Sequence, residues 1–222
     1  MGIITVKDLK HTYQDGMKKN NVLKGINAEF EKGKFYAILG ESGSGKTTLL
    51  SLLAGLDSIQ DGDILFNNKS LKKIGYNNYR LRDANIIFQA YNLISYMTAM
   101  ENVIVAMDIM KVKEKDKKEY ALRLLEKLGI DKQTANRTVL KLSGGEQQRT
   151  AIARCMVGNV PIILADEPTG NLDEETEEKI IDIFKELTKE GKCVIVVTHS
   201  KKVANNADVI FKIKKGLMEE AN

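Results

Sequence analysis

The feature that most constrains the fold of this chain is an apolar run that leads into a glycine-rich loop and then into a helical pattern. The run FYAIL covers residues 35–39, the loop GESGSGKT covers residues 40–47, and TLLSLLAGL continues the helical pattern. A continuously apolar strand is typical of a parallel sheet that is buried on both faces. The loop matches G-x-x-x-x-G-K-[ST], a pattern whose backbone N–H groups cradle phosphates. These residues predict an α/β fold with a phosphate site between a strand and a helix.

The positions within this loop have distinct expected parts in the site. Gly40, Gly43 and Gly45 let the backbone wrap closely around phosphates. Lys46 is expected to contact the β- and γ-phosphates, and the hydroxyl of Thr47 to ligate Mg²⁺. The alternative is a Gly/Ser-rich turn that happens to precede Lys-Thr, but the flanking strand and helix favour the phosphate site. The other expected members of the nucleotide cradle are Glu41, Ser42, Ser44 and Thr48.

Composition limits the classes of protein to consider. The length of 222 residues suggests one domain, and 43% hydrophobic with 29% charged residues is ordinary for a globular protein. The net charge is +4 with both signs interleaved, so we expect no nucleic-acid partner. Cys155 and Cys193 lie in apolar stretches, which predicts buried thiols in a reducing cytosol. The first ten residues lack a signal-peptide pattern and no apolar run approaches membrane-spanning length, so we expect no membrane span.

The rest of the chain alternates between strand and helix patterns. Strands are predicted at residues 3–9, 26–30, 35–39, 62–68, 161–165, 193–197 and 208–213. Between about residues 99 and 158, apolar residues recur at the three- and four-residue spacing of helices. After residue 160 strands and helices alternate, which predicts a parallel sheet with helices on its faces. We predict a single domain over residues 1–222, with a core in residues 1–89 and 159–222 and a helical subdomain at about 90–158.

Two adjacent carboxylates follow an apolar strand in VPIILADEP, residues 160–168. Ligands of parallel sheets bind at the carboxyl ends of the strands, which is where these side chains are expected. Asp166 is expected to hold Mg²⁺, directly or through water. Glu167 is expected to polarise the attacking water as a general base. The alternative is an acidic helix start, because acidic residues favour that end of a helix.

Three further side chains are candidates for the nucleotide site because of the strands that they follow or belong to. His199 comes after the apolar run CVIVVT and is placed to reach a γ-phosphate, although a lone histidine is often structural. Gln89 ends the apolar run IIFQ, and its amide is expected to contact the γ-phosphate, the attacking water or the metal. Tyr13 in HTYQDG either stacks on adenine or is only an aromatic residue at a strand end.

A second glycine-containing stretch, LSGGEQQR, covers residues 142–149. Ser143 is a good N-cap for the helical pattern that follows. Gly144 and Gly145 would leave backbone N–H groups free at the positive end of that helix, which suits an anion. The alternative is a capped helix start with two loop glycines. That alternative does not explain why a chain with one phosphate loop has a second anion-binding turn.

In this order, GESGSGKTT, FQ, LSGGEQQR, ILADEPTGNLD and VTHS resemble the motifs of an ABC ATPase, and the resemblance covers nearly the whole chain. It implies a P-loop NTPase, RecA-like core with an antiparallel β subdomain and a helical subdomain that carries the signature LSGGEQQR. It also implies ATP and Mg²⁺ as ligands. By the same resemblance, Tyr13 stacks on adenine and His199 is the switch histidine.

The resemblance further implies an ATP-sandwich dimer of two copies of the chain. In such a dimer Ser143, Gly144 and Gly145 of one copy contact the γ-phosphate held on the phosphate loop of the other. Asp173, in NLD, would cross the dimer interface.

A narrower resemblance lies in FQAYNLISYMTAMENV and ADEPTGNLD, which are similar to ATPases of macrolide export, antimicrobial-peptide export, lipoprotein release and a cell-division relative. It implies a separate permease with a large extracytoplasmic domain, docked near residues 89–96, a periplasmic or cell-surface adaptor, and a place at the cytoplasmic face of the membrane. Glu146, where glutamine is frequent, and the absence of a proline after ENV depart from this pattern. The alternatives are a regulatory ATP switch of a cell-division or cell-wall complex and a soluble assembly ATPase of iron–sulfur type.

Overall fold

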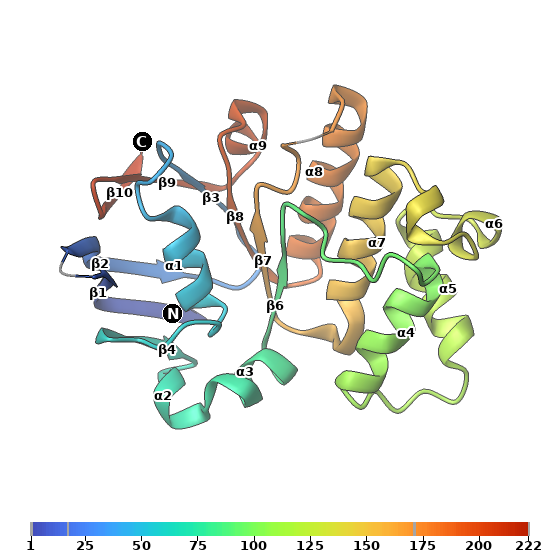
Figure 1. Cartoon of the computed structure of the whole chain (residues 1–222), viewed down its shortest axis with the longest axis horizontal. Coiled ribbons are helices and arrows are strands. Elements are labelled where there is room, and N and C mark those ends of the chain that lie inside the picture. The colour runs from blue at the N-terminus through green and yellow to red at the C-terminus, as the bar shows by residue number, and fades with distance from the viewer. Residues whose placement is uncertain (1, 17, 171, 222) are drawn as a thin grey trace.

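The computed structural model describes residues 2–16, 18–170 and 172–221, so Asn171 of the NLD motif lies outside the described residues. The described residues form two sheets and two groups of helices (Figure 1). The helices between residues 99 and 156 gather beyond one edge of the larger sheet, on the opposite side of the molecule from the strands at residues 4–15 and 18–30. Among the described residues, no helix combines the length and the apolar character that crossing a bilayer requires.

The larger sheet has the strand order β10-β9-β3-β8-β7-β6. Its strands are β3 (Phe35–Leu39), β6 (Ala84–Ile87), β7 (Ile162–Asp166), β8 (Cys193–Val197), β9 (Val209–Lys214) and β10 (Leu217–Ala221). The pairs formed by β9, β3, β8, β7 and β6 are parallel, which confirms the predicted parallel sheet. Strand β10 was not predicted and adds an antiparallel edge to β9.

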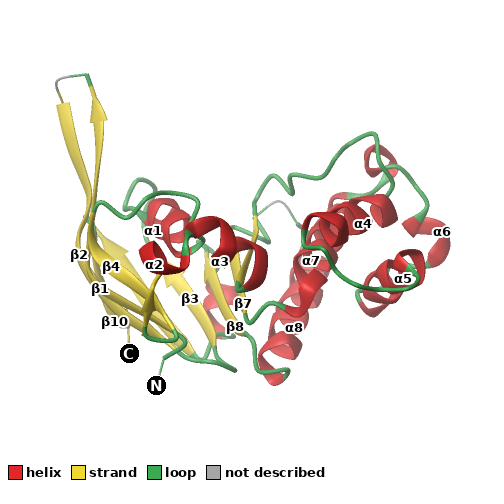
Figure 2. Ribbon diagram, turned by 90° about the horizontal axis from the view of Figure 1, so that it is seen from below, coloured by secondary structure: helices red, strands yellow, loops and turns green. Residues whose placement is uncertain are grey.

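The smaller sheet is antiparallel and has the order β2-β1-β4-β5. Its strands are β1 (Ile4–Asp15), β2 (Lys18–Phe30), β4 (Asp61–Phe66) and β5 (Lys69–Ser70). Figure 2 shows β1 and β2 as a long hairpin that extends from the body of the molecule. Ile26 and Phe30 are buried, as the predicted alternation requires, but β2 begins well before residue 26.

Helices cover both faces of the parallel sheet. Helix α1 (Lys46–Leu53) packs between the two sheets, and its leucines share one core with β1, β2, β3 and β8. Helix α8 (Glu174–Lys189) contacts β8 and β3, and α9 (Lys201–Asn205) contacts β3. Phe184 of α8 belongs to a second core. Because α1 follows β3 directly, the phosphate loop lies at the carboxyl edge of the sheet.

The second group of helices builds its core from apolar side chains at helical spacing. Its main members are α4 (Ala99–Ile109), α5 (Lys117–Lys127) and α7 (Gly144–Met156), as the periodicity predicted. The short helices α2 (Leu71–Ile74), α3 (Tyr76–Arg82) and α6 (Lys132–Ala135), with the 3₁₀ turns at Val139–Lys141 and Val157–Asn159, were not predicted. The division of the chain at residues 89 and 159 stays a prediction.

Candidate active site

A cavity of about 680 Å³, called the main cavity below, lies at the carboxyl edge of the parallel sheet. The loops that follow β3, β6, β7 and β8 contribute its polar groups, and β2 contributes one wall. This edge is where parallel sheets bind ligands. The lining residues are Asn20, Val22, Ser42, Gly43, Gly45, Lys46, Thr47, Thr48, Gln89, Asp166, Glu167, Gly170 and His199.

The phosphate loop, residues 40–47, has the backbone conformation that its glycines permit. Gly43 has a φ of 76° and Gly45 a φ of 109°, a region that favours glycine. A Cβ on Gly45 would lie 2.8 Å from Cδ2 of Leu23 and 3.1 Å from the carbonyl oxygen of Val22. Gly45 is also the N-cap of α1 and provides no side-chain cap. The first N–H groups of this helix are therefore free to bind an anion in the main cavity.

Lys46 is held with its ammonium group inside the site. Its side chain is only 7% exposed, and Nζ donates to the carbonyl oxygens of Gly40 at 2.7 Å and Glu41 at 3.0 Å. Burial lowers the pKa of Lys46, and the charges of Glu167 and Asp166 act in the opposite direction. Nζ also lies 3.2 Å from Nε2 of His199. Since an ammonium group only donates, this contact requires the lone pair of the imidazole on Nε2 and its proton on Nδ1.

Asp166, Thr47 and Gln89 contribute oxygen atoms to the lining of the main cavity, and Thr47 donates a hydrogen bond to Asp166. Burial raises the pKa of Asp166, repulsion from Glu167 raises it further, and a hydrogen bond from Thr47 and the charge of Lys46 lower it. No group of three or more His, Cys, Asp or Glu residues in the described part of the chain could hold a metal by itself. Mg²⁺ does not need such a group, because it binds one or two protein oxygens together with phosphates and water. The donor set therefore fits Mg²⁺ beside a nucleotide.

Glu167 has a constrained backbone and a carboxylate that faces His199. Its φ of 45° is uncommon for a residue with a side chain. One carboxylate oxygen, Oε2, accepts a hydrogen bond of 3.1 Å from the backbone N–H of His199. The other, Oε1, is buried, lies 3.4 Å from Nε2 of His199 and has no hydrogen-bond partner among the described residues. This unpartnered oxygen in the main cavity can accept a proton from a water molecule.

Tyr13 stands beside the main cavity rather than among its lining residues. Its hydroxyl accepts a hydrogen bond of 3.4 Å from Oγ1 of Thr48, and its ring is 45% exposed. The edge of its ring packs on buried His11, with ring centroids 4.7 Å apart. Sequence reasoning missed Asn20 and Val22, which line the cavity from β2. Asn20 could have been found from the antiparallel pairing of β1 with β2, because this pairing sets Asn20 opposite Tyr13.

The second glycine turn lies outside the main cavity. Ser143 caps α7, and none of Ser143, Gly144 and Gly145 lines the cavity. A Cβ on Gly144 would lie 3.5 Å from the hydroxyl of Tyr91, in the segment that follows Gln89. Asp173 is also absent from the cavity lining and caps α8 through a hydrogen bond from the N–H of Thr176.

Three residues of the phosphate loop are not in the main cavity lining. Gly40, Glu41 and Ser44 instead line a second cavity, which residues of β9 and β10 also line. The carbonyl oxygens of Gly40 and Glu41 still hold Lys46, so these two residues support the site through their backbone. Within one chain, the structure brings together the phosphate loop, Gln89, Asp166, Glu167 and His199 but not the turn at residues 143–145.

Comparison with known protein families identifies the chain. The family described as "ABC transporter" matches residues 23–170. The ABC transporter ATP-binding protein YclH of Bacillus subtilis, which is uncharacterized, is 46% identical over 217 residues, with 97% of this chain and 95% of YclH covered.

Two relatives with named systems are also similar. The macrolide export ATP-binding/permease protein MacB of Mannheimia succiniciproducens is 39% identical over 97% of this chain, but the chain spans only 34% of the length of MacB. The lipoprotein-releasing system ATP-binding protein LolD of Legionella pneumophila is 38% identical, with 96% of each chain covered.

A solved structure confirms the predicted fold class. The ATP-binding cassette MJ0796, in a dimeric post-hydrolysis state bound to ADP and phosphate, superposes with a TM-score of 0.91 at 34% identity, and 99% of each chain is covered. The fold is that of a P-loop NTPase with an added antiparallel sheet. The chain belongs to the ABC transporter family, as one of its ATP-binding and ATP-hydrolysing cassettes.

Proposed function

We propose that this cassette hydrolyses ATP in a dimer of two copies and thereby drives a separate membrane permease. The observation that carries the proposal is the main cavity itself. It combines a phosphate loop, oxygen donors for Mg²⁺ and a buried carboxylate oxygen with no hydrogen-bond partner.

In this proposal the phosphates of ATP lie on the phosphate loop. The free N–H groups at the start of α1 bind their oxygens, and Lys46 exchanges its carbonyl partners for the β- and γ-phosphates. Thr47, Asp166 and Gln89 would hold Mg²⁺, which when bound neutralises charge on the phosphate oxygens. Tyr13, whose hydroxyl accepts a hydrogen bond from Thr48 of the cavity lining, would stack on the base.

Glu167 acts as the general base. A water molecule attacks the γ-phosphorus while Oε1 of Glu167 accepts its proton. The bond from the γ-phosphorus to the bridging oxygen breaks, and ADP leaves with the electron pair. The backbone N–H of His199 donates to Glu167, and Nε2 of its imidazole accepts from Lys46. When Lys46 turns towards the nucleotide, Nε2 would be released, and the tautomer with its proton on Nε2 would donate to the γ-phosphate.

The second copy supplies the remaining anion contacts. The N–H groups of Gly144 and Gly145, at the positive end of α7, have the chemistry to bind a γ-phosphate but are absent from the main cavity of their own chain. The dimeric state of the cassette MJ0796 supports this arrangement. In the closed dimer Asp173 would lie at the interface.

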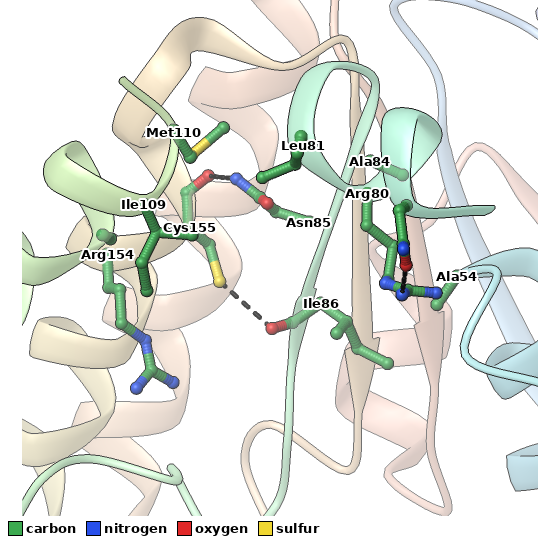
Figure 3. A pocket seen from close by; sticks show the side chains of 12 residues that line it. Ala54, Arg80, Leu81, Ala84, Asn85, Ile86, Ile109, Met110, Arg154 and Cys155 are labelled. Carbon is green, nitrogen blue, oxygen red and sulfur yellow. Dashed lines mark hydrogen bonds between the residues drawn. The ribbon is translucent and has the colours of Figure 1, made fainter. Parts of the chain in front are cut away.

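The permease is proposed to dock in a groove between α3 on one side and α4 and α7 on the other (Figure 3), called the docking groove below. The groove encloses about 480 Å³. One wall carries Ile109 and Arg154, the other carries Leu81, and Ile86 of β6 lies between them. Ile109 is 62% exposed and Leu81 is 40% exposed, so the groove offers apolar surface to a partner helix.

A chain of contacts connects the docking groove to the main cavity. Arg154 lines the groove, and its guanidinium donates to the carbonyl oxygens of Tyr91, at 2.7 Å, and Asn92. Tyr91 and Asn92 have φ values of 58° and 49°, so this segment is held in an uncommon conformation. Gln89, two residues before Tyr91, lines the main cavity. A permease element that displaces Arg154 would therefore move the segment at residues 89–96, where docking is expected. This movement would alter the position of Gln89 in the main cavity.

The relatives support a permease of the kind that serves macrolide export or lipoprotein release. Such a permease is proposed to carry a large extracytoplasmic domain and to act with a periplasmic or cell-surface adaptor. LolD and YclH have nearly the length of this chain, which supports a permease on a separate polypeptide. The cassette would then lie at the cytoplasmic face of the membrane.

Substitution Glu167→Gln tests the hydrolytic mechanism. The variant keeps the shape of the side chain but cannot accept the proton, so hydrolysis is expected to fall by about 10²–10⁴-fold while ATP binding persists. Steady-state phosphate release and binding of labelled ATP measure the two effects. The matched control is Glu126→Gln on the exposed face of α5. Near-normal turnover of Glu167→Gln would contradict the general-base role.

Co-purification tests the partner. A tagged chain expressed in its own host is expected to capture a permease with transmembrane helices and a large extracytoplasmic domain. Ile109→Asp should abolish capture by placing a charge in the docking groove, whereas Leu217→Asp, at an exposed position on β10, should not. Capture of soluble scaffold proteins in place of a permease would contradict the transport proposal.

A further inference from the structure

A second cavity, called the lysine cavity below, lies behind the phosphate loop. It encloses about 620 Å³ and is lined by the outer side of the loop, the start of α9, and strands β9 and β10. Ser42, Gly43 and His199 line both this cavity and the main cavity. The phosphate loop and the switch histidine therefore form a shared wall between the two cavities.

The lysine cavity has an excess of positive charge. Lys201, Lys212, Lys214 and Lys215 line it, against the carboxylates of Glu41 and Glu219. None of the four lysines forms an ion pair or a side-chain hydrogen bond with another described residue. The neighbouring lysine at position 202 behaves differently, because it pairs with carboxylates of α8. Uncompensated positive charge in a concave site attracts anions.

A buried hydroxyl adds an independent indication of a ligand. Ser44 is only 7% exposed, and its Oγ has no hydrogen-bond partner among the described residues. Ser44 lines the lysine cavity and is absent from the lining of the main cavity. A buried polar group without a partner is unfavourable, and an oxygen atom of a ligand in the cavity would satisfy it.

We propose that the lysine cavity binds a small phosphate-bearing anion. The hydroxyl of Ser44 donates to a phosphate oxygen at the inner end, and Lys201 and Lys214 balance its charge from α9 and β9. The chemistry is the same for free phosphate, pyrophosphate and a phosphate monoester. The four lysines are flexible side chains on exposed backbone positions, so they can adjust to the size of the ligand.

Occupation of the lysine cavity is expected to weaken ATP binding. The bound anion lies across the phosphate loop from the phosphates of ATP, and like charges repel. By thermodynamic linkage, ATP must weaken binding of the anion by the same factor. Phosphate produced by hydrolysis and phosphorylated small molecules from solution are the two possible sources of the anion.

The test is a titration of the whole chain with inorganic pyrophosphate, followed by calorimetry, while Mg²⁺ and a non-hydrolysable ATP analogue saturate the main cavity. One saturable site is expected. Lys201→Ala/Lys214→Ala should weaken it by at least about tenfold, because two charged partners are lost. Lys113→Ala/Lys115→Ala, which removes the same charge from the exposed loop between α4 and α5, should not change it. Basal hydrolysis should be unchanged in both double variants.

Further measurements distinguish the two sources of the anion. They also distinguish failure of the lysine cavity proposal from failure of the proposed function. Tighter binding of inorganic phosphate than of AMP assigns the site to the hydrolysis product, and the reverse order assigns it to a phosphorylated metabolite. If the chain does not bind the ATP analogue, the proposed function is contradicted. The lysine cavity can then still be measured by pyrophosphate titration of Lys46→Ala, because Lys46 lines only the main cavity. The lysine cavity proposal is overturned if pyrophosphate does not saturate the protein, or if both double variants bind it equally.

Discussion

The two helices that begin with glycine turns, α1 and α7, differ in what occupies their first N–H groups. At α1 the N-cap is Gly45, which has no side chain to accept a hydrogen bond. At α7 the N-cap Ser143 accepts from the N–H of Glu146, and the carboxylate of Glu146 accepts from the N–H of Ser143 at 2.7 Å. This reciprocal capping box satisfies two of the groups that α1 leaves open.

The difference indicates that α1 is built to be completed by a ligand, whereas α7 is largely complete without one. The main cavity surrounds the start of α1 with Lys46 and Thr47, but no described residue of α7 reaches it. At α7 the capping box leaves only the N–H groups of Gly144 and Gly145 free to bind an anion, and they lie beside the negative charge of Glu146. Such a turn is suited to a supporting contact with a phosphate that another site already holds.

The largest expected effect comes from adding a methyl group to each turn. Gly45→Ala should lower ATP affinity of the isolated chain by about 100-fold or more, because a φ of 109° strains alanine and its Cβ would meet the carbonyl oxygen of Val22. Gly145→Ala would meet only side chains, with Cγ2 of Thr176 at 2.8 Å, so ATP affinity should be unchanged. Hydrolysis by the assembled protein should fall in both variants.

Binding of a fluorescent ATP analogue to the dilute chain, together with phosphate release at high protein concentration, separates these outcomes. If Gly145→Ala weakened ATP binding by the dilute chain as much as Gly45→Ala, the two turns would not differ as described.

A second prediction concerns stability without ligands. Asp166→Asn should stabilise the nucleotide-free protein at neutral pH, since burial and Glu167 disfavour the carboxylate and raise its pKa. A raised pKa in the folded state means that this group begins to destabilise the fold as the pH rises above the pKa it has in the unfolded chain. The penalty is complete above the folded-state pKa, and protonation at lower pH removes it. The melting temperature of Asp166→Asn should exceed that of the wild type by a few degrees, about 2–4 °C per kcal/mol.

Thermal unfolding without Mg²⁺ or nucleotide measures this difference at several pH values. It should shrink as the pH falls towards the usual range of an aspartic acid, about 4. A gap that grows in acid would show that Asp166 is stabilised rather than destabilised by its surroundings.

The smallest effect is expected at α7. Glu146→Gln preserves the capping box, because glutamine can also accept from the N–H of Ser143. It removes one negative charge beside the proposed γ-phosphate contact, a repulsion of about 1 kcal/mol for unit charges roughly 4 Å apart in water. ATP-dependent dimerisation should tighten by a few-fold. Sedimentation of Glu146→Gln combined with Glu167→Gln, compared with Glu167→Gln alone, can measure this change. The control is Glu190→Gln, at the end of α8 and far from both turns. If Glu190→Gln tightened dimerisation equally, the local charge of Glu146 would be excluded as the cause.

Sequence reasoning succeeded where one pattern decides the local structure. FYAIL followed by the glycine loop predicted β3, the loop and α1, and the apolar strands ending at Gln89, Asp166 and His199 predicted the groups that meet at one sheet edge. It missed α2, α3, α6, β5 and β10, which are too short or too exposed to carry a clear period.

Other features depend on tertiary packing. Asn20 reaches the main cavity only because the hairpin pairs β2 with β1, and its neighbourhood in sequence gives no sign of a ligand. The motif also specifies the backbone of the phosphate loop but not the direction of each side chain. For this reason Ser44, expected in the main cavity, lines the lysine cavity instead.

The central claim, that α1 of one copy and α7 of another form a single site, is tested most directly by mixing two inactive variants. Lys46→Ala removes the phosphate contact at α1, and Ser143→Arg blocks the turn at α7. A mixed dimer of the two retains one intact pair of α1 and α7, so the mixture should hydrolyse ATP faster than either variant alone. Lys46→Ala mixed with a chain that carries both substitutions has no intact pair and is the control. Activity of the first mixture no higher than that of this control would contradict the claim.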